Sequence, residues 1–221
     1  CPKSSCPSPE RYIEAYRTEA ENVYVVTLSS HLSGSHNSAQ LGKNLYKETY
    51  GEKNIHVVDS ESASCGEAQI AMKIMELEES GLSFAEVIEK AEQFRDELHT
   101  YFVLDNLDTL RKNGRLTGVK SVVASTLNIK PVMDADKGVI RQRGQGIGMK
   151  KALTKMVDLI ASELKNPDKK TIMITHCNCL QRAQTVREML EAKVKCKAIT
   201  IWDTAGISSM YANDGGIIVT V

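Results

Sequence analysis

Three continuous apolar runs stand out in the first half of the chain. They cover residues 22–30, 54–60 and 99–105, and within them β-branched and aromatic residues follow one another with little polar alternation. Such runs are typical of strands buried on both faces of a sheet. Helical patterns fill the intervals, first from Ser35 to Thr49 and then between residues 66 and 98. Strand alternating with helix at these lengths predicts a largely parallel, doubly covered sheet with right-handed crossovers.

The pattern changes near residue 106. Short helical stretches lead into a predicted hairpin, residues 129–144, and a long helix is predicted at 148–164. A strand, a helix and two further strands complete the chain. We therefore predict a two-lobed α/β fold, with residues 1–106 forming an N-terminal lobe and residues 107–221 a C-terminal lobe.

Composition and charge exclude some function classes and favour others. The chain has 221 residues, and its 28 Lys and Arg residues balance its 28 Asp and Glu residues, so the formal net charge is zero. This balance gives no electrostatic support for binding nucleic acid or an anionic membrane surface. Six cysteines in a chain of this length do not make a disulfide scaffold. We expect reduced thiols, a cytoplasmic location and no membrane-spanning segment, and we expect a fragment because the chain starts at Cys1.

The stretch SSHLSGSHNSAQ, residues 29–40, follows the first predicted strand and opens a helix. Open α/β sheets bind ligands at this place, where a helix start offers unpaired N–H groups. Ser33 and Ser35 add hydroxyl donors and Gly34 allows close approach to the backbone, which together suit a carboxylate or a phosphate. The alternative is that Ser33 or Ser35 is only the N-cap of the helix. A nucleophile is a weaker hypothesis, because a G-x-S-x-G elbow is absent, as is a phosphate-binding P-loop.

Four other groups of residues stand out, and most of them have an ordinary structural explanation. His176, Cys177 and Cys179 invite a metal hypothesis, but structural zinc sites usually space paired thiols two to four residues apart. The GQGIG run at 144–148 is a weak nucleotide signal, and we interpret it as a flexible segment before the long helix. Asp59 follows a strand and could simply cap the next turn. Arg111 and Lys112 suit a helix C-terminus, whereas Arg115, beyond the Asn-Gly turn, is freer to point into a cleft.

Several stretches together resemble the DegV family of bacterial fatty-acid-binding proteins. KSSCPSPERYIEAY resembles the family's Lys-Thr-Ser-Gln-Pro-Ser segment with the helix after it, and VTLSSHLSGSHNSA resembles its most recognisable loop. VVDSESASCGEA resembles a strand-to-helix turn of the family, and YFVLDNLDTLRKNGRLTG followed by LNIKPVMDADKGVI matches its central block in order and spacing. The resemblance covers nearly the whole chain and is strongest from residue 22 to about residue 140.

The resemblance implies a two-lobed protein, mostly parallel in its N-terminal lobe, that buries a long acyl chain in an apolar tunnel. By position, Ser4 and Ser33 would hold the carboxylate of palmitate, stearate or oleate, helped by the Gly34 N–H. Arg115 matches an arginine of the family that takes part in presenting the head group to a partner protein. That partner would be a separate fatty-acid kinase, so the resemblance implies no enzyme activity, metal or cofactor in this chain, no nucleic acid, and only transient membrane contact.

The chain departs from the family pattern in three places. The family's N-terminal strand is missing, Cys6 stands where the family has glutamine, and Met210 stands where a histidine often completes the head-group site. The loss of that histidine puts the polar clamp and the kinase partnership in question more than the acyl tunnel. A function of a different class therefore stays open, a hydrolase or transferase that uses the Ser29–Ser38 loop as an oxyanion or phosphate site.

Overall fold

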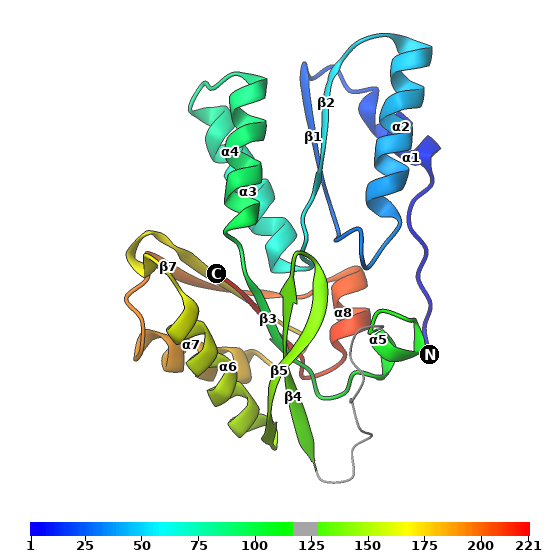
Figure 1. Ribbon diagram of the computed structural model, residues 1–221. Coiled ribbons are helices and arrows are strands. Elements are labelled where there is room, and N and C mark those ends of the chain that lie inside the picture. The colour runs from blue at the N-terminus through cyan, green and yellow to red at the C-terminus, as the bar shows by residue number, and fades with distance from the viewer. Residues whose placement is uncertain (117–127) are drawn as a thin grey trace. The chain divides into compact units, whose positions relative to one another are not determined.

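The computed structural model describes residues 1–116 and 128–221, and Figure 1 shows the elements in order. The first half holds α1 (Pro9–Tyr16), β1 (Asn22–Thr27), α2 (Ser35–Tyr50), β2 (Asn54–Asp59), α3 (Cys65–Glu79), α4 (Phe84–Asp96) and β3 (Thr100–Val103). The second half holds α5 (Asp108–Lys112), β4 (Ile129–Asp136), β5 (Val139–Ile147), α6 (Met149–Glu163), a 3-10 turn (Pro167–Lys169), β6 (Thr171–His176), α7 (Leu180–Glu191), β7 (Ala198–Asp203), α8 (Gly206–Ala212) and β8 (Ile217–Thr220). The helix expected across residues 118–127 falls outside the described residues.

Two compact units make up the described chain. The small unit comprises Ser4–Ala63 and Glu67–Glu97, and the large unit comprises Cys1–Lys3, Ser64–Gly66 and the described part of Leu98–Val221. The fold is mixed α/β, with a parallel two-stranded sheet and a mixed six-stranded sheet, which confirms the predicted fold class. The lobe boundary near residue 106 stays a prediction.

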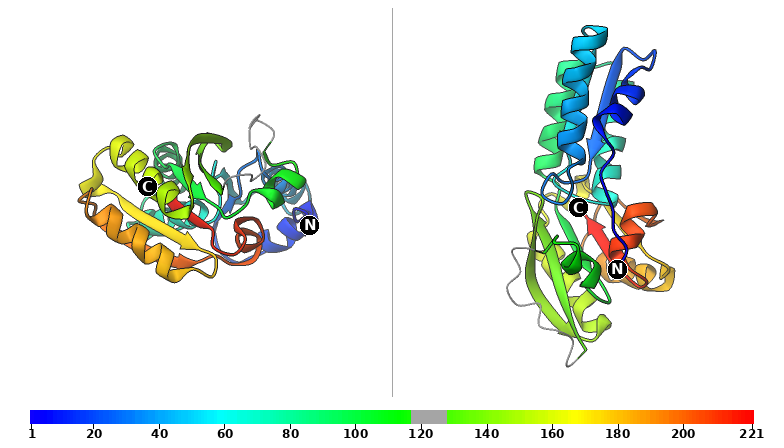
Figure 2. Two further views of the ribbon diagram at one scale, coloured as in Figure 1. Left: turned by 90° about the horizontal axis from the view of Figure 1, so that it is seen from below. Right: turned by 90° about the vertical axis from the view of Figure 1, so that its right-hand side faces the viewer.

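The small unit is built on the parallel pair β1 and β2. Their register runs from Asn22 opposite Asn54 to Thr27 opposite Asp59, so the two strands end side by side. Helix α2 contacts both strands, and α4 contacts β2 (Figures 1 and 2). The core of this unit contains apolar side chains from β2, α3 and α4, namely Val58, Ile70, Ile74, Leu77, Val87 and Ala91.

Helix α1 packs closely on α2 at a glycine. A Cβ at Gly42 would stand 2.9 Å from the Pro9 carbonyl oxygen and 3.0 Å from the Tyr12 Cβ, so no larger side chain fits between the helices. The buried Tyr16 phenol donates to the Ala39 carbonyl at 2.9 Å, which ties the same two helices together. This contact holds α1 in a defined position against the start and middle of α2.

The large unit is built on six strands in the order β5-β4-β3-β8-β6-β7. Among the described strands of this sheet, β6 and β7 pair in parallel and the other neighbours pair antiparallel. Helix α6 contacts β3, β4 and β5, and α7 contacts β6 and β7. Sheet and helices share one core, which includes Tyr101, Val103, Val132, Leu153, Met156, Val157, Ile160, Ile172, Ile174, Val186, Leu190, Ile217 and Val219.

The strand after the second long helical region is placed differently from the prediction. Residues 99–105 were expected to join the parallel sheet of the first two strands, but β3 pairs antiparallel with β4 and with β8. All four residues of β3 are buried. A continuous apolar run reports burial on both faces and carries no information about the direction of the neighbouring strands. The expectation that residues 99–105 join the parallel sheet is therefore wrong.

The GQGIG run is also corrected by the structure. It was expected to be a flexible segment, yet Gly144 and Gly146 lie within strand β5, and Gly148 is the N-cap of α6 with φ of 77°. A Cβ at Gly146 would stand 2.6 Å from the Ala152 Cα, so the glycine allows strand and helix backbones to meet. Glycine in a strand often marks such a close backbone approach, and here it serves packing within the fold.

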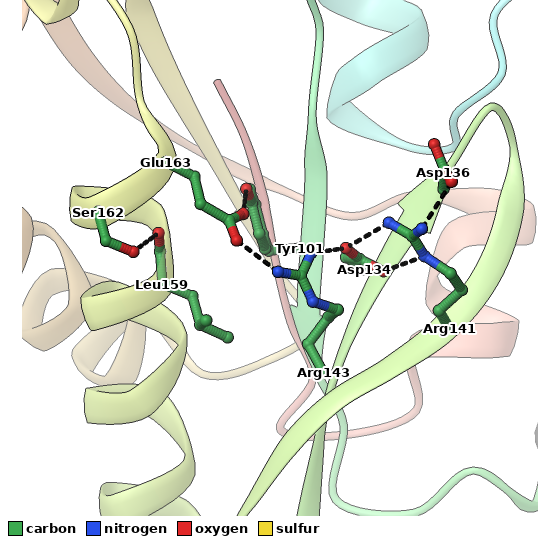
Figure 3. Close-up of polar contacts among 8 residues, drawn as sticks. All are labelled: Tyr101, Asp134, Asp136, Arg141, Arg143, Leu159, Ser162 and Glu163. Carbon is green, nitrogen blue, oxygen red and sulfur yellow. Dashed lines mark hydrogen bonds and ion pairs between the residues drawn. The ribbon is translucent and has the colours of Figure 1, made fainter.

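A charged network covers the sheet beside the C-terminal end of α6 (Figure 3). The Asp134 side chain is 6% exposed and accepts from Arg141 at 3.0 Å and from Arg143 at 2.5 Å. Arg143 also pairs with Glu163 of α6, whose carboxylate accepts the Tyr101 phenol at 2.7 Å. Burial and the Glu163 carboxylate raise the pKa of Tyr101, so the phenol stays protonated and donates. A nearly buried carboxylate is tolerable here because two guanidinium groups neutralise it.

No helix within the ranges 1–116 and 128–221 has the combination of length and apolar composition that spanning a bilayer takes.

Candidate functional site

The serine loop lies where the parallel strands of the small unit end. Strand β1 ends at Thr27, the loop follows, and α2 begins at Ser35. Because Thr27 is opposite Asp59, the turn after β2 lies next to the serine loop. The carboxyl ends of adjacent parallel strands are a usual place for ligands in open α/β sheets.

Hydrogen bonds fasten this loop to the turn after β2. The Ser29 N–H donates to the Ser62 carbonyl at 3.0 Å, and the Ser60 N–H donates to the Thr27 carbonyl at 3.1 Å. The Asp59 carboxylate accepts the N–H groups of Ser30 and Glu61, each at 3.1 Å. Asp59 thus caps the turn after β2, as one interpretation of the sequence predicted. It also accepts a hydrogen bond from the backbone of the serine loop.

The pKa of Asp59 reflects these contacts. Burial disfavours its charged form, but hydrogen bonds from Ser30 and from the backbone N–H of Glu61 outweigh burial and place the pKa below its ordinary value. A carboxylate with a depressed folded-state pKa stabilises the fold at pH values above its unfolded pKa, and this stabilisation is lost as the pH falls through the folded pKa.

We expect Asp59→Asn to lower the free energy of unfolding by about 1 kcal/mol at pH 7, because an amide oxygen accepts the two N–H groups without a charge. The difference should shrink as the pH falls through the lowered folded-state pKa of Asp59, because wild type and variant then both carry a neutral side chain. Urea unfolding over a series of decreasing pH values measures this difference, and a loss that persists unchanged at the acid end of the series would contradict this role of the charge.

The start of α2 is organised by Gly34 and two hydroxyl groups. Gly34 occupies the N-cap position and offers no capping side chain, and the Ser38 N–H donates to its carbonyl at 2.9 Å. The Ser33 hydroxyl accepts the Ser35 N–H at 3.2 Å and bonds with the Ser35 hydroxyl at 2.8 Å. The alternative that Ser33 or Ser35 is itself the N-cap is therefore wrong. Gly34 has no side chain that could accept the N–H groups of the first turn. These groups therefore present the positive end of the dipole of a 16-residue helix.

The N-terminal segment reaches the same helix start. A Cβ on Gly34 would stand 3.2 Å from the Cys6 sulfur, and that sulfur lies 3.7 Å from the Ser38 hydroxyl oxygen. Ser4, two residues before Cys6, is half-buried and belongs to the same small unit. Ser33, Gly34 and the segment that carries Ser4 are thus gathered around one helix N-terminus.

Tyr12 of α1 is a residue that the sequence reasoning missed. Its phenol shares a hydrogen bond with the Ser35 side chain, and burial, the largest influence, raises its pKa despite that bond. The sequence showed Tyr12 only as one position of a short helical pattern. Its place beside the serine loop depends on the packing of α1 against α2 at Gly42, which no local pattern specifies.

His36, in the first turn of α2, is oriented toward a threonine. The His36 Nδ1 lies 3.4 Å from the Thr27 hydroxyl, which also donates to the Val58 carbonyl at 3.3 Å. This contact engages one ring nitrogen of His36 with a strand residue of the small unit.

Arg115 belongs to the large unit. Its guanidinium donates to the Asn113 carbonyl at 2.5 Å and lies 5.9 Å from the centroid of the Tyr211 ring. Arg111 and Lys112, which were interpreted as a solvated helix end, pair with Asp108 at 3.0 and 3.5 Å. Met210, which stands at the position of the expected family histidine, lies in α8 beside Tyr211.

The side chains of the HCNC stretch engage the backbone around them. The His176 Nδ1 accepts the Cys179 N–H at 3.3 Å, which leaves its Nε2 facing Asp203 at 3.5 Å. The thiols of Cys177 and Cys179 point to the carbonyl oxygens of Ser209 and Gly216 at 3.9 and 3.6 Å. In the part of the chain that the structure describes, no group of three or more His, Cys, Asp or Glu side chains is arranged to hold a metal ion.

Comparison with known proteins identifies the family. The model of the DegV family, described as a family of uncharacterised proteins, matches residues 1–220. The chain belongs to the DegV family. A DegV domain-containing protein of Streptococcus pyogenes serotype M1 is 36% identical over 217 residues, a match that covers 98% of this chain and 76% of the relative.

Solved structures of DegV proteins share this fold. A DegV-family protein from Ruminococcus gnavus, refined with vaccenic acid, is 57% identical, with a TM-score of 0.96 over 99% of this chain and 78% of that protein. The Streptococcus pneumoniae Fatty Acid Kinase (Fak) B3 protein, loaded with linoleic acid, is 34% identical, with a TM-score of 0.86 over 98% of this chain and 76% of that protein. The predicted family membership is thereby confirmed.

Proposed function

We propose that this DegV chain binds a long-chain fatty acid such as palmitate, stearate or oleate. The hydroxyl groups of Ser4 and Ser33 and the Gly34 N–H hold the carboxylate, and the acyl chain lies in an apolar tunnel. The observation that carries the proposal is the α2 N-terminus, where Gly34 leaves the helix without a side-chain cap and Ser33 places a hydroxyl beside it. The fatty acids in the solved structures of the Ruminococcus gnavus and Streptococcus pneumoniae relatives support it.

The energetics of such a site divide between head group and tail. Each charge-assisted hydrogen bond to a carboxylate contributes about 1.5–3 kcal/mol, and the positive end of the helix dipole adds to this. Each buried methylene contributes about 0.8 kcal/mol, so a long acyl chain supplies most of the affinity. The polar groups therefore orient the ligand, and the apolar tunnel retains it.

In this proposal the chain is a carrier without catalytic activity of its own. A separate fatty-acid kinase phosphorylates the carboxylate of the bound ligand, and Arg115 contributes to presenting the head group to that partner. The similarity to the Fak B3 protein supports the kinase partnership.

The experiment that tests the function is native mass spectrometry of the protein purified without added lipid, followed by solvent extraction of whatever is released. We expect an equimolar long-chain fatty acid in the wild type. Ser33→Ala and Ser4→Ala should each weaken oleate binding about 10-fold or more, because each removes one hydrogen bond to a charged group. Ser5→Ala, one residue from Ser4, is the matched control and should bind oleate as the wild type does.

Other outcomes would contradict the proposal. A protein that carries no lipid and takes up no oleate would not be a fatty-acid carrier. Hydrolysis of an acyl ester that Ser33→Ala abolishes would support the hydrolase alternative instead. With ATP alone, the loaded protein should leave the fatty acid unphosphorylated, because phosphoryl transfer belongs to the kinase partner.

A further inference from the structure

The six-stranded sheet of the large unit has two edges, and the strands that form them differ. Strand β5 carries Arg141, Arg143 and two glycines, and its pairing with β4 has a register shift between Val132 and Met133. Charged side chains and irregularities of this kind keep a sheet edge from pairing with another chain. Strand β7 lies at the opposite edge and, among the described strands, pairs only with β6 (Figure 1). The β7 edge is therefore the one open to a further strand.

The sequence of β7 has none of the features that protect β5. Residues 198–202 read AITIW, without a charge, a proline or a glycine. The β-branched residues in the middle favour strand pairing, and Trp202 is 46% exposed. Ala198, Thr200 and Trp202 share one face of the strand, because side chains alternate along it. An exposed apolar edge of this composition is a template for another strand.

The unpaired backbone groups of β7 belong to alternate residues. The Thr204 N–H, directly after the strand, donates to the His176 carbonyl of β6 at 2.8 Å. Backbone groups point to alternate sides along a strand, so those of Ile199 and Ile201 point away from β6. When two such strands pair antiparallel about Thr200, Ile199 of each copy is opposite Ile201 of the other. These two residues can then exchange both of their N–H···O bonds.

The charges at the two ends of β7 fit the same register. Lys197 directly precedes the strand and is exposed, and Asp203 ends it with a side chain that is 84% exposed. Pairing about Thr200 places Lys197 of each copy opposite Asp203 of the other, which gives two pairs of opposite charge. It also places Trp202 opposite Ala198 of the second copy, a large side chain against a small one. Shifting one strand by two residues, the smallest shift that keeps the backbone bonds, loses both charge pairs.

We propose that the partner of the β7 edge is a second copy of this chain, bound by antiparallel pairing of the two β7 strands about Thr200. The two six-stranded sheets then form one continuous sheet, related by a two-fold axis at Thr200. Strand β7 belongs to the large unit, whereas the serine loop belongs to the small unit. The pairing therefore uses no residue of the serine loop, and the inference stands independently of the proposed function.

The test is sedimentation equilibrium of the full chain between about 1 and 300 μM, because an interface of one strand per copy is at the small end of the size range. We expect the wild type to show a monomer–dimer equilibrium. Lys197→Asp and Asp203→Lys each turn both charge pairs into like-charge pairs, and each should weaken dimer formation about 10-fold or more. Lys195→Asp changes an exposed lysine that has no charged residue opposite it. This matched control should dimerise as the wild type does.

A mixture of the two charge variants tests the register itself. Equimolar Lys197→Asp and Asp203→Lys chains again have opposite charges at both positions, so they should form a heterodimer within about threefold of the wild-type affinity. Such recovery would support the proposal, because antiparallel pairing about Thr200 brings position 197 of one copy opposite position 203 of the other.

Three results would overturn the proposal. The first is a wild type that stays monomeric over the whole concentration range. The second is a dimer that tolerates both charge reversals, because the copies would then meet at another face. The third is weakening by each variant without recovery in the mixture, which would contradict the pairing about Thr200.

Discussion

Gly146→Ala is expected to lower the free energy of unfolding by about 3–4 kcal/mol, at the upper end of what overpacking costs. The added Cβ would stand 2.6 Å from the Ala152 Cα and from the Lys151 carbonyl carbon, which are backbone atoms of α6. Backbone atoms within a helix cannot move singly, so α6 has to shift away from strand β5. Urea unfolding followed by fluorescence of Trp202, the single tryptophan of the chain, reports on the large unit that contains both elements.

Gly144→Ala is the matched control for this substitution. Gly144 lies two residues earlier on the same strand, but its Cβ would meet the end of the Lys155 side chain, which can rotate away. We expect a loss within about 1 kcal/mol. Equal losses from the two variants would contradict the close backbone approach as the cause, because both replace a strand glycine by alanine.

Arg143→Met is expected to cost about 2–4 kcal/mol, because it leaves a nearly buried carboxylate short of one of its two guanidinium partners. Arg143 lies between Asp134 and Glu163 in Figure 3 and pairs with both. Without it, Asp134 retains Arg141 and Glu163 retains the Tyr101 phenol, so each carboxylate loses one charged partner. The same urea unfolding experiment measures the loss.

Arg141→Met removes the other partner of Asp134 and provides the comparison. The Arg141 side chain is 45% exposed, against 30% for Arg143, and it pairs with Asp136 rather than with helix α6. We expect a loss of about 1 kcal/mol, since Arg143 still neutralises Asp134. If Arg141→Met destabilised the protein more than Arg143→Met, the pairing of Arg143 with both Asp134 and Glu163 would not be the more stabilising part of the network.

Much of the local structure could be predicted from the pattern of residues. The parallel strands β1 and β2, the long helix α6 and the hairpin of β4 and β5 lie close to where the pattern of apolar residues places them. These elements are predictable because burial on both faces of a strand leaves a continuous apolar run, and burial on one face leaves a period in the sequence. The capping box of Ser83 and Glu86 at the start of α4 can also be recognised in the sequence, because its two partners are only three residues apart.

Contacts between residues distant in the chain were not predictable in this way. The antiparallel partners of β3, the contact of Gly146 with α6, and the approach of Tyr12 to Ser35 all join segments that no local pattern connects. Gly34 at the N-cap is a related case. Two serines flank it, and either is a better N-cap residue by propensity, yet the turn made by the Ser33 hydroxyl and the Ser35 N–H places the glycine there.

The sequence by itself determined the family, the α/β class and the loop that opens helix α2, because each depends on residue types in a local order. The tertiary structure decided how that loop is assembled. It brought Asp59 to the backbone of the loop, Cys6 to Gly34 and Tyr12 to Ser35. Hydrogen bonds and close packing act over a few ångströms in space regardless of separation along the chain, so the surroundings of the serine loop depend on the packing of α1 against α2.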